Sequence, residues 1–492
     1  MPADLPPGTP LQIGVSGRMK GFSLSRGRDF YSARFAILPF EGLTRIDSAG
    51  VVQPSLATHW DTLDGGRHFR FHLRRNVRFH DGTLFGSADV VRAWTLALQS
   101  DRVDHPWMLD AISGAAASTR TEVALRGLTA VNDSTLDVFL TAPLLQFPRL
   151  ITGPQAFIGA QASSDSVAIG TGPWQWRVGA ADADSIRLRR FARYWGVRPQ
   201  MAALTIRVVA DSLMPQAIMH GTVDCTADLT RESMIALAAR TDVKITYRTP
   251  LGVVRLVLNE QTPALTDWRV RRALVLALDR TRLASDASAS PSRVANGPLP
   301  PNVAGSDSTY VSYPYDPTAA RELLMRAGFA AGLPRPLRLR LPSSGLVEFS
   351  SDLRSLLTTY WAEVGITVEV PSDPAAPVDL QLRVSYPETL DADDYLYSRF
   401  HSSLAGEAGN SGGFRDTIVD RLLDSGRVVV DSTRRHQLMR SASVRIDSLV
   451  PNIFLWYVPV TSASHVRMRY CDAGLASSTF VHAVRTNEPS TR

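Results

Sequence analysis

The histidines of the chain are the first residues whose type and spacing could support chemistry. His68 and His72 fall on the same face of a predicted strand, where two imidazoles could hold a metal ion. No third ligand is adjacent to them, and polar side chains on the outer face of a half-buried strand account for both. His80 precedes the turn pair Asp81-Gly82, and a histidine at such a strand end requires no acid–base role. The histidine pattern therefore predicts neither a metal site nor a catalytic base.

Closely spaced carboxylates are the second candidate, because such groups can bind calcium. Asp391, Asp393 and Asp394 form an acidic run, but the run lacks the glycine and the distal glutamate of an EF-hand loop. It predicts either the acidic first turn of a helix or a loop that faces a ligand.

Motifs for phosphate binding or nucleophilic catalysis are missing from the sequence. Gly170-Thr171-Gly172 could begin a phosphate loop, but it has no third glycine and runs into Pro173, so it predicts a turn. There is no Walker A loop, no His-Glu-x-x-His and no Gly-x-Ser-x-Gly. We therefore expect no enzymatic activity, no cofactor and no metal.

The composition is that of an ordinary globular protein, long enough for several domains. The 492 residues carry a formal net charge of +6, and Lys20 and Lys244 are the only lysines beside many arginines. The densest basic stretches, residues 187–190 and 335–340, alternate with apolar residues, which is typical of half-buried strands. A nucleic-acid surface would gather its basic residues on one element, so we expect no nucleic-acid partner.

The cysteines and the apolar stretches bear on the compartment. Cys225 and Cys471 lie far apart in the sequence and do not have the spacing of a metal site. An exported chain could join them in a disulfide, but two separate buried thiols are expected. No apolar run is long enough to span a membrane, and residues 1–7 do not resemble a signal peptide. Either an export leader is missing from this sequence or the protein is cytoplasmic.

The elements that position all of these residues are predicted strands and helices. Strands and helices alternate along the chain, which indicates α/β architecture. Strands are predicted at residues 11–15, 67–73, 127–141 (a hairpin turning at Asn132-Asp133), 186–190, 204–209, 337–341 and 366–370. Helices are predicted at residues 29–44, from Ser87 onward, at 267–284, from Asp316 to Gly328, at 348–364 and at 416–450.

A series of short motifs resembles the bacterial extracellular solute-binding proteins of family 5, the peptide- and nickel-type binding proteins of ABC transporters. Residues 52–60 (Val-Gln-Pro-Ser-Leu-Ala-Thr-His-Trp) are similar to the family's P-x-L-A-x-x-W segment. One matching motif lies upstream, at residues 40–43. The others follow in order at residues 64–66, 69–74, 77–82, 87–90, 170–174, 193–199, 267–280 and 315–329.

Most of these motifs are expected to be structural. Phe69, Phe71 and Trp94 should lie in the core, and Asp267 and Arg271 should cap a helix and pair with each other. They identify a fold and do not mark a ligand site.

The resemblance implies a fold of two α/β lobes of the periplasmic-binding-protein type (type II), with an inserted domain and a hinge between the lobes. The first lobe would comprise residues 1–48, 166–258 and 455–492, the inserted domain 49–165, and the second lobe 259–454. The hinge would cross near Leu258-Asn259 and Leu455-Tyr457. A ligand would lie between the lobes, which would close around it.

The resemblance also implies where a peptide amine would bind. Peptide-binding members hold it with an acidic residue three positions before an Asp-Pro pair. Here Asp391-Ala392 stands in the place of that pair, which puts Glu388 in the anchoring position, where the family commonly has aspartate. The alternative is that Glu388 is a solvated loop carboxylate.

Four further residues are candidates for contact with the ligand. Asn410 and Phe414 belong to a loop that resembles the family's N-x-x-G-aromatic segment beside the ligand. Tyr386 and Trp456 are aromatic candidates, for which a plain core position is the alternative.

The implied function is that of a solute-binding subunit, exported to the periplasm or cell envelope with or without a lipid anchor. It would act as a monomer that captures a peptide or similar small ligand and delivers it to ABC permease subunits in the membrane. Peptides, nickel chelates, sugars and opines all remain open as ligands, and Glu388 favours one with an amine. A cytoplasmic ligand sensor with the same fold is the alternative, although no helix-turn-helix is visible before residue 50. A hydrolase has only scattered histidines and aspartates in its favour.

Overall fold

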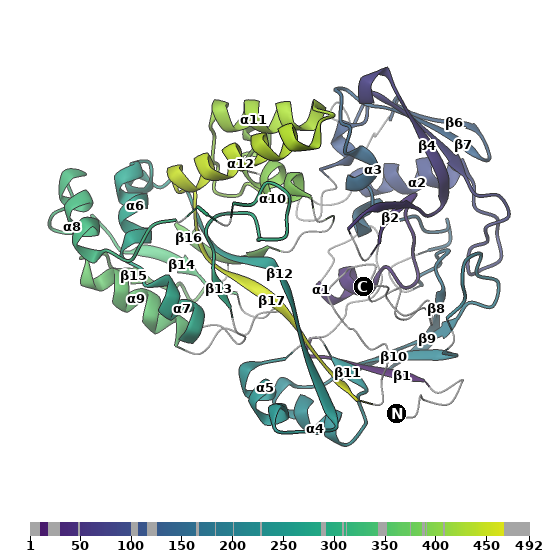
Figure 1. Cartoon of the computed structure of the whole chain (residues 1–492), viewed down its shortest axis with the longest axis horizontal. Helices are drawn as coiled ribbons and strands as arrows, with labels where there is room; N and C mark the ends of the chain where they lie inside the picture. The colour runs from purple at the N-terminus through teal and green to yellow at the C-terminus, as the bar shows by residue number, and fades with distance from the viewer. Residues whose placement is uncertain are drawn as a thin grey trace. The chain divides into compact units, whose positions relative to one another are not determined.

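The computed structural model describes residues 10–17, 30–47, 50–99, 107–115, 125–163, 167–182, 184–199, 201–226, 229–286, 292–307, 309–310, 312–342, 352–373, 375–385, 389, 391–406 and 409–466. The chain forms two compact units. Unit 1 comprises Met1–Arg248 and Val460–Arg492, and unit 2 comprises Thr249–Pro459. Strands β12 (Val243–Leu258) and β17 (Asn452–His465) carry the chain from one unit to the other (Figure 1). The residue boundaries predicted for the two lobes and the inserted domain stay predictions.

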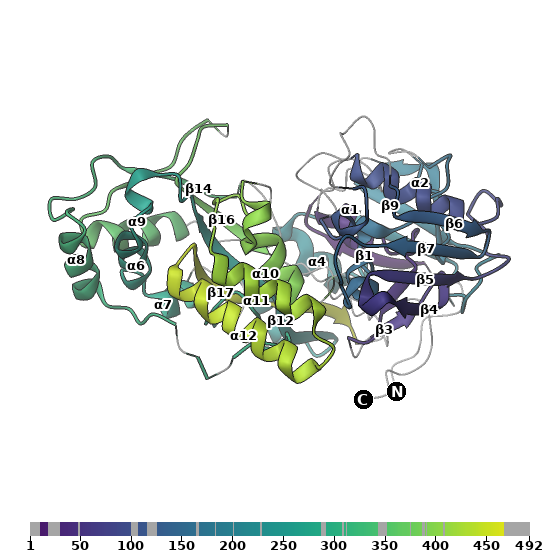
Figure 2. The same ribbon diagram turned by 90° about the horizontal axis from the view of Figure 1, so that it is seen from above.

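Unit 1 contains a four-stranded antiparallel sheet with a hydrophobic core of its own. Its strands, in spatial order, are β4 (Ala57–Leu63), β5 (His68–Leu73), β7 (Thr135–Phe139) and β6 (Leu128–Asn132). Helix α2 (Ser87–Leu98) packs beside β6 (Figure 2). The predicted core residues Phe69, Phe71 and Trp94 are fully buried, and the Trp94 indole N–H donates to Ala156 O at 3.0 Å. The predicted hairpin and the helix from Ser87 are therefore confirmed.

Five further strands of unit 1 belong to the mixed eleven-stranded sheet, of which β12 and β17 are also members. These five strands, in spatial order, are β11 (Cys225–Thr226), β1 (Leu11–Val15), β10 (Ala203–Val208), β9 (Ser185–Arg190) and β8 (Trp174–Asp182). Strand β1 runs parallel to both of its neighbours, pairing Leu11 with Leu204 and Ile13 with Cys225. Parallel neighbours require a crossover, which α4 (Met214–Met219) supplies between β10 and β11. The smaller elements of unit 1 are β2 (Thr44–Ile46), β3 (Val52–Pro54), α3 (Phe147–Leu150) and α5 (Arg231–Ala238).

The helix predicted at residues 29–44 is much shorter in the structure. Helix α1 spans only Phe30–Phe35. Pro39 cannot continue a helix, and the carbonyls that would extend this one are used elsewhere. Leu38 O accepts from Trp174 N at 3.3 Å, and Pro39 O accepts from Gly172 N at 3.0 Å. A distant turn therefore ends the helical segment.

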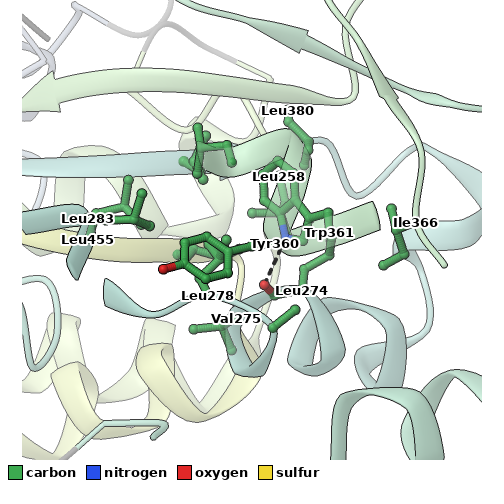
Figure 3. Packing of buried hydrophobic residues seen from close by; sticks show 14 of the residues in the cluster. Leu258, Leu274, Val275, Leu278, Leu283, Tyr360, Trp361, Ile366, Leu380 and Leu455 are labelled. Atoms are coloured by element: carbon green, nitrogen blue, oxygen red, sulfur yellow. Dashed lines mark hydrogen bonds between the residues drawn. The ribbon is translucent and has the colours of Figure 1, made fainter. Parts of the chain in front are cut away.

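The sheet of unit 2 is covered on one face by four helices. Its strands, in spatial order, are β15 (Val368–Glu369), β14 (Leu337–Arg340), β16 (Leu380–Ser385), β12 and β17, with β13 (Arg293–Val294) also on β17. The helices are α6 (Trp268–Leu276), α7 (Arg280–Asp286), α8 (Pro317–Arg326) and α9 (Leu353–Glu363). Their apolar residues share one core with Val254, Leu256 and Leu258 of β12. In this core the Trp361 indole N–H donates to Leu274 O at 3.0 Å (Figure 3).

The opposite face of this sheet carries a second core. Helices α11 (Thr417–Val428) and α12 (Ser432–Leu449) lie side by side and pack with α10 (Ala392–Phe400) (Figures 1 and 2). Val253 of β12 belongs to this core, whereas Val254 belongs to the first one. The alternation of side chains along β12 therefore assigns each residue to one face of the sheet.

The helix predicted at residues 267–284 is divided into α6 and α7. Asp316 N donates to Leu276 O at 2.8 Å, so this carbonyl is not available for a continuous helix. Asp279 then starts α7, because its Oδ1 accepts from Arg282 N at 3.0 Å. The predicted helical stretch 416–450 is likewise two helices, α11 and α12.

Cys225 corrects the expectation of two separate thiols. It is fully buried in β11 and is disulfide-bonded. Cys471, the other cysteine of the sequence, lies outside the described residues. Across the described segments, no helix combines the length and the apolar character needed to cross a membrane.

Candidate functional site

Glu41 joins three of the sequence motifs within unit 1. Its buried carboxylate accepts from Thr171 Oγ1 at 3.0 Å, from the Tyr194 hydroxyl at 2.8 Å and from the Trp195 indole N–H at 2.8 Å. A carboxylate with three such donors holds distant segments together and has no need of a ligand. These motifs are therefore structural, as expected.

His80 is buried in the same region as a structural residue. Its Nδ1 accepts from Gly170 N at 3.3 Å, which leaves Nε2 as the donor to Gly172 O at 3.0 Å. A Cβ atom at Gly170 or Gly172 would collide with the backbone of residues 38–39, which explains both glycines of the motif. A ring whose Nδ1 accepts a hydrogen bond is neutral, and burial, which lowers the pKa of the His80 imidazole, favours the same state.

The motif at the start of α6 caps the helix as predicted, but with a different ion pair. Asp267 accepts from Arg269 N at 2.8 Å and pairs with the Arg269 guanidinium at 2.6 Å. Arg271 does not pair with Asp267. It donates to Leu265 O at 2.8 Å and to Leu449 O at 2.9 Å, so its charge is satisfied by backbone carbonyls. The expected Asp267–Arg271 pair is therefore wrong, because the N-cap carboxylate is reached by the closer residue of the first turn.

Each carboxylate of the acidic run at the start of α10 has a partner within unit 2. Asp391 caps the helix and pairs with Arg435 of α12 at 2.5 Å. Asp393, fully buried, pairs with Arg427 of α11 at 3.0 Å, and burial raises the pKa of its carboxyl. Asp394 accepts from Thr389 N at 2.9 Å. The first of the two predicted alternatives, an acidic first turn of a helix, is the observed one.

Neither a calcium nor a histidine metal site is formed by these groups. His68 Nε2 lies 3.2 Å from Asp137, and His72 Nε2 lies 2.9 Å from Asp61. Within the part of the chain that the structure describes, no three histidine, cysteine or acidic side chains gather as metal ligands.

Asn410 and Phe414 lie together in one loop of unit 2. Asn410 is buried, and its amide donates to Phe414 O at 2.9 Å and to His401 O at 3.2 Å, while its Oδ1 accepts from Phe414 N at 3.0 Å. Phe414 is buried and lies edge-on to Phe400 with ring centroids 6.0 Å apart. The side chain of Asn410 therefore fixes the loop, and contact of either residue with a ligand stays a prediction.

Trp456 lies on the other face of the sheet of unit 2. It is fully buried in the core formed with α6–α9, whereas Phe414 belongs to the core formed with α10–α12. The structure therefore does not bring Trp456 together with Asn410 and Phe414. Tyr386 and Glu388 lie outside the described residues.

Three arginines that sequence reasoning missed lie on the α10-facing side of this sheet. Arg255 of β12 is directly paired with Arg383 of β16, and α10 contributes Arg399. Burial, with repulsion from Arg399 and Arg383, lowers the pKa of Arg255 well below its usual range. Burial, with repulsion from Arg340 and Arg399, lowers the pKa of Arg383. The sequence did contain a signal for two of these arginines, because each stands inside an otherwise largely apolar strand. These strands are residues 253–257 (Val-Val-Arg-Leu-Val) and 380–384 (Leu-Gln-Leu-Arg-Val).

Comparison with known proteins places the chain in a family. The family model described as "Bacterial extracellular solute-binding proteins, family 5 Middle" matches residues 51–406. The "Probable deoxycholate-binding periplasmic protein YgiS" of Escherichia coli (strain K12) is 25% identical over 495 residues, which cover 93% of this chain and 91% of that protein. The "Dipeptide-binding protein" of the same strain is 22% identical over 439 residues, covering 82% and 80%.

Among solved structures, the periplasmic binding protein DppA from Helicobacter pylori in complex with the peptide STSA has a TM-score of 0.84 at 18% identity. The match covers 98% of this chain and 99% of that one. This likeness confirms the predicted α/β periplasmic-binding-protein fold. The family match, over residues 51–406, covers most of the chain. The chain therefore belongs to the bacterial extracellular solute-binding proteins of family 5.

Proposed function

We propose that this protein is the solute-binding component of an ABC importer for peptides or similar small solutes, and that it catalyses no reaction. The family match over residues 51–406 carries the proposal. A dipeptide-binding relative and a likeness to a peptide complex support peptide as the ligand class. The protein would act as a monomer and pass its ligand to permease subunits in the membrane.

The proposed location is the periplasm or cell envelope, with a lipid anchor as one form of attachment. The periplasmic relative supports it, and so does the disulfide at Cys225, because disulfides persist in oxidising compartments. The same disulfide counts against the alternative of a cytoplasmic ligand sensor.

In the proposed site, Glu388 holds the amine of the ligand. The neighbouring carboxylates support this assignment, because Asp391 and Asp393 are already paired with Arg435 and Arg427. A ligand amine would need a carboxylate outside that network. Tyr386 would contact the ligand, and Asn410 with Phe414 would hold their loop beside it.

A thermal-shift screen with di- to pentapeptides tests the proposal. A ligand present at one hundred times its Kd should add about 2.7 kcal/mol of stability, which is readily seen as a higher melting temperature. The variant Glu388→Gln should need more peptide for the same shift. Glu322→Gln, an exposed position on α8, should behave as the wild type.

Two outcomes would count against the proposal at different levels. If no peptide raises the melting temperature, peptide is not the ligand class. If peptides act equally on wild type and Glu388→Gln, Glu388 is not the amine anchor.

A further inference from the structure

One hairpin of unit 1 collects positive charge without any acidic residue. Strands β9 and β10 pair antiparallel (Figure 1), and Arg190 N donates to Ala202 O at 3.0 Å where the loop between them begins and ends. Residues 185–207 are here called the arginine hairpin. The stretch contains no aspartate or glutamate but six arginines, namely Arg187, Arg189, Arg190, Arg193, Arg198 and Arg207.

The alternation of side chains along β9 places arginines on one face of the hairpin. Ile186 and Leu188 are buried in the core of unit 1, so Arg187 and Arg189 lie on the opposite face, where both are exposed. The pairing of β10 with β9 places the exposed Arg207 on this same face. Like charges on one face of neighbouring strands repel each other, so this face favours a negatively charged partner.

The loop of the hairpin adds charge and an apolar side chain. Arg193 and Arg198 are both exposed. Val197, which stands between them in the sequence, is 66% exposed. Basic groups beside an exposed apolar residue suit the surface of a lipid bilayer, where the basic groups meet phosphates and the apolar group enters the boundary of the acyl chains.

Carboxylates of the described residues leave much of this charge unpaired. Within these segments, Arg189, Arg193 and Arg207 form no ion pair. By contrast Arg240, which is also exposed on unit 1, pairs with Asp242 at 2.8 Å. The hairpin therefore presents guanidinium groups that are available to an external anion.

Phosphate is an anion that these groups fit well, because the planar guanidinium fork matches its oxygens. A nucleic acid also carries phosphates, but surfaces that bind single strands add aromatic rings on which bases stack. Trp195, the partly exposed aromatic residue of the hairpin, is already engaged. Its indole N–H donates to Glu41, and the Arg74 guanidinium lies over its ring, 4.3 Å from the centroid. The hairpin therefore favours a bilayer over a nucleic acid.

We propose that the arginine hairpin docks on the anionic phospholipid surface of a membrane. The arginines contact lipid phosphates, and Val197 enters the boundary between headgroups and acyl chains. The inference goes beyond the proposed function, because it applies whichever solute the protein binds. Docking of this kind would keep the protein next to the membrane that holds the proposed permease.

The test measures co-sedimentation with vesicles at low ionic strength. The wild type should bind vesicles that contain phosphatidylglycerol and not vesicles of phosphatidylcholine alone, and added salt should weaken the binding. The triple variant Arg189→Gln/Arg193→Gln/Arg207→Gln should bind about a hundredfold more weakly, because each basic residue at such a surface contributes roughly a factor of five. A wild type without preference for phosphatidylglycerol would overturn the inference.

A second triple variant is the matched control. Arg354→Gln/Arg421→Gln/Arg434→Gln removes the same charge from exposed positions of α9, α11 and α12, and should bind vesicles much as the wild type does. Equal loss in both triple variants would show that binding follows net charge alone, which overturns a role of the hairpin.

Two further readouts separate this inference from others. Wild-type affinity for single-stranded DNA equal to that for the vesicles, at matched phosphate concentration, would mark a general polyanion surface and also overturn the inference. Both triple variants should keep the wild-type melting temperature and its response to peptides, so a failure of membrane docking is distinguishable from a failure of the proposed function.

Discussion

His80 shows how a single residue can look functional in the sequence and be structural in the fold. Its two ring nitrogens are fully used by Gly170 N and Gly172 O, and the glycines approach so closely that no side chain would fit. Glu41 ties the same turn to Tyr194 and Trp195 through its carboxylate. These polar residues are retained for the position of a loop, and no substrate needs to reach them.

The neutral state of His80 predicts a pH dependence of stability. Because burial lowers its pKa below the ordinary 6.5, the unfolded chain binds a proton that the folded protein does not. The contribution of His80 is therefore present above about pH 6.5 and is lost as the pH falls. Urea unfolding between pH 7 and pH 5 should show a steeper loss of stability in the wild type than in His80→Gln, by at most about 1.4 kcal/mol per pH unit.

His436, exposed on α12, provides the matched control. His436→Gln should follow the wild-type pH profile. Identical profiles for His80→Gln and the wild type would mean that His80 gains no proton on unfolding in this range.

At the scale of elements, helix ends are set by carboxylates that often serve a second helix. Asp416 caps α11, with Oδ1 accepting from Val419 N at 2.8 Å and from Ile418 N at 3.1 Å. Both of its oxygens also accept from Arg445 of α12 at 2.7 Å, and this hydrogen bonding lowers the pKa of Asp416. One side chain thus starts a helix and fastens it to its neighbour.

Substitutions at Asp416 should separate the two roles. Asp416→Asn keeps a capping oxygen and loses the charge that faces Arg445, whereas Asp416→Ala loses both. We expect the alanine variant to be less stable than the asparagine variant by about 1 kcal/mol, the usual value of a cap. Arg445→Met should add little to Asp416→Ala, because the partner is already gone. Chemical denaturation midpoints of the wild type, the two Asp416 variants and the double variant Asp416→Ala/Arg445→Met measure these differences. Equal stability of the two Asp416 variants would contradict the capping role.

Elements whose signals are local could be predicted from the sequence. The alternation of β5, the 128–139 hairpin and the helix from Ser87 all have their periodicity and turn residues within one short stretch. The early end of α1 and the division of α6 from α7 could not be predicted in this way. The backbone groups that end these helices bond to Gly172 and Asp316, which lie far along the chain.

The same limit applies to the candidate site. The family motifs placed Glu388 by its sequence neighbours, but the pairing of Arg255 with Arg383 depends on the register of β12 and β16. A register between distant strands is decided by tertiary packing, which no short stretch of sequence contains.

At the scale of the whole molecule, the disulfide of Cys225 makes stability dependent on redox conditions. A native disulfide typically contributes about 2–4 kcal/mol, so equilibrium unfolding in the presence of a thiol reductant should occur at lower urea concentration. Cys225→Ala should show the lower stability with and without reductant. A wild-type midpoint that does not respond to reductant would contradict a stabilising disulfide.

The order of the two units along the chain has a consequence for folding during synthesis. Unit 2 is one uninterrupted stretch, whereas unit 1 is assembled from residues before it and after it. The last part of β17, at Ala463 and Ser464, pairs with Thr226 and Cys225 of β11. As the polypeptide leaves the ribosome, unit 2 is complete while β11 still lacks this neighbour. Unit 1, whose synthesis begins first, is therefore the unit that finishes folding last. A chain that terminates after unit 2 would contain all the residues of unit 2 but not all those of unit 1.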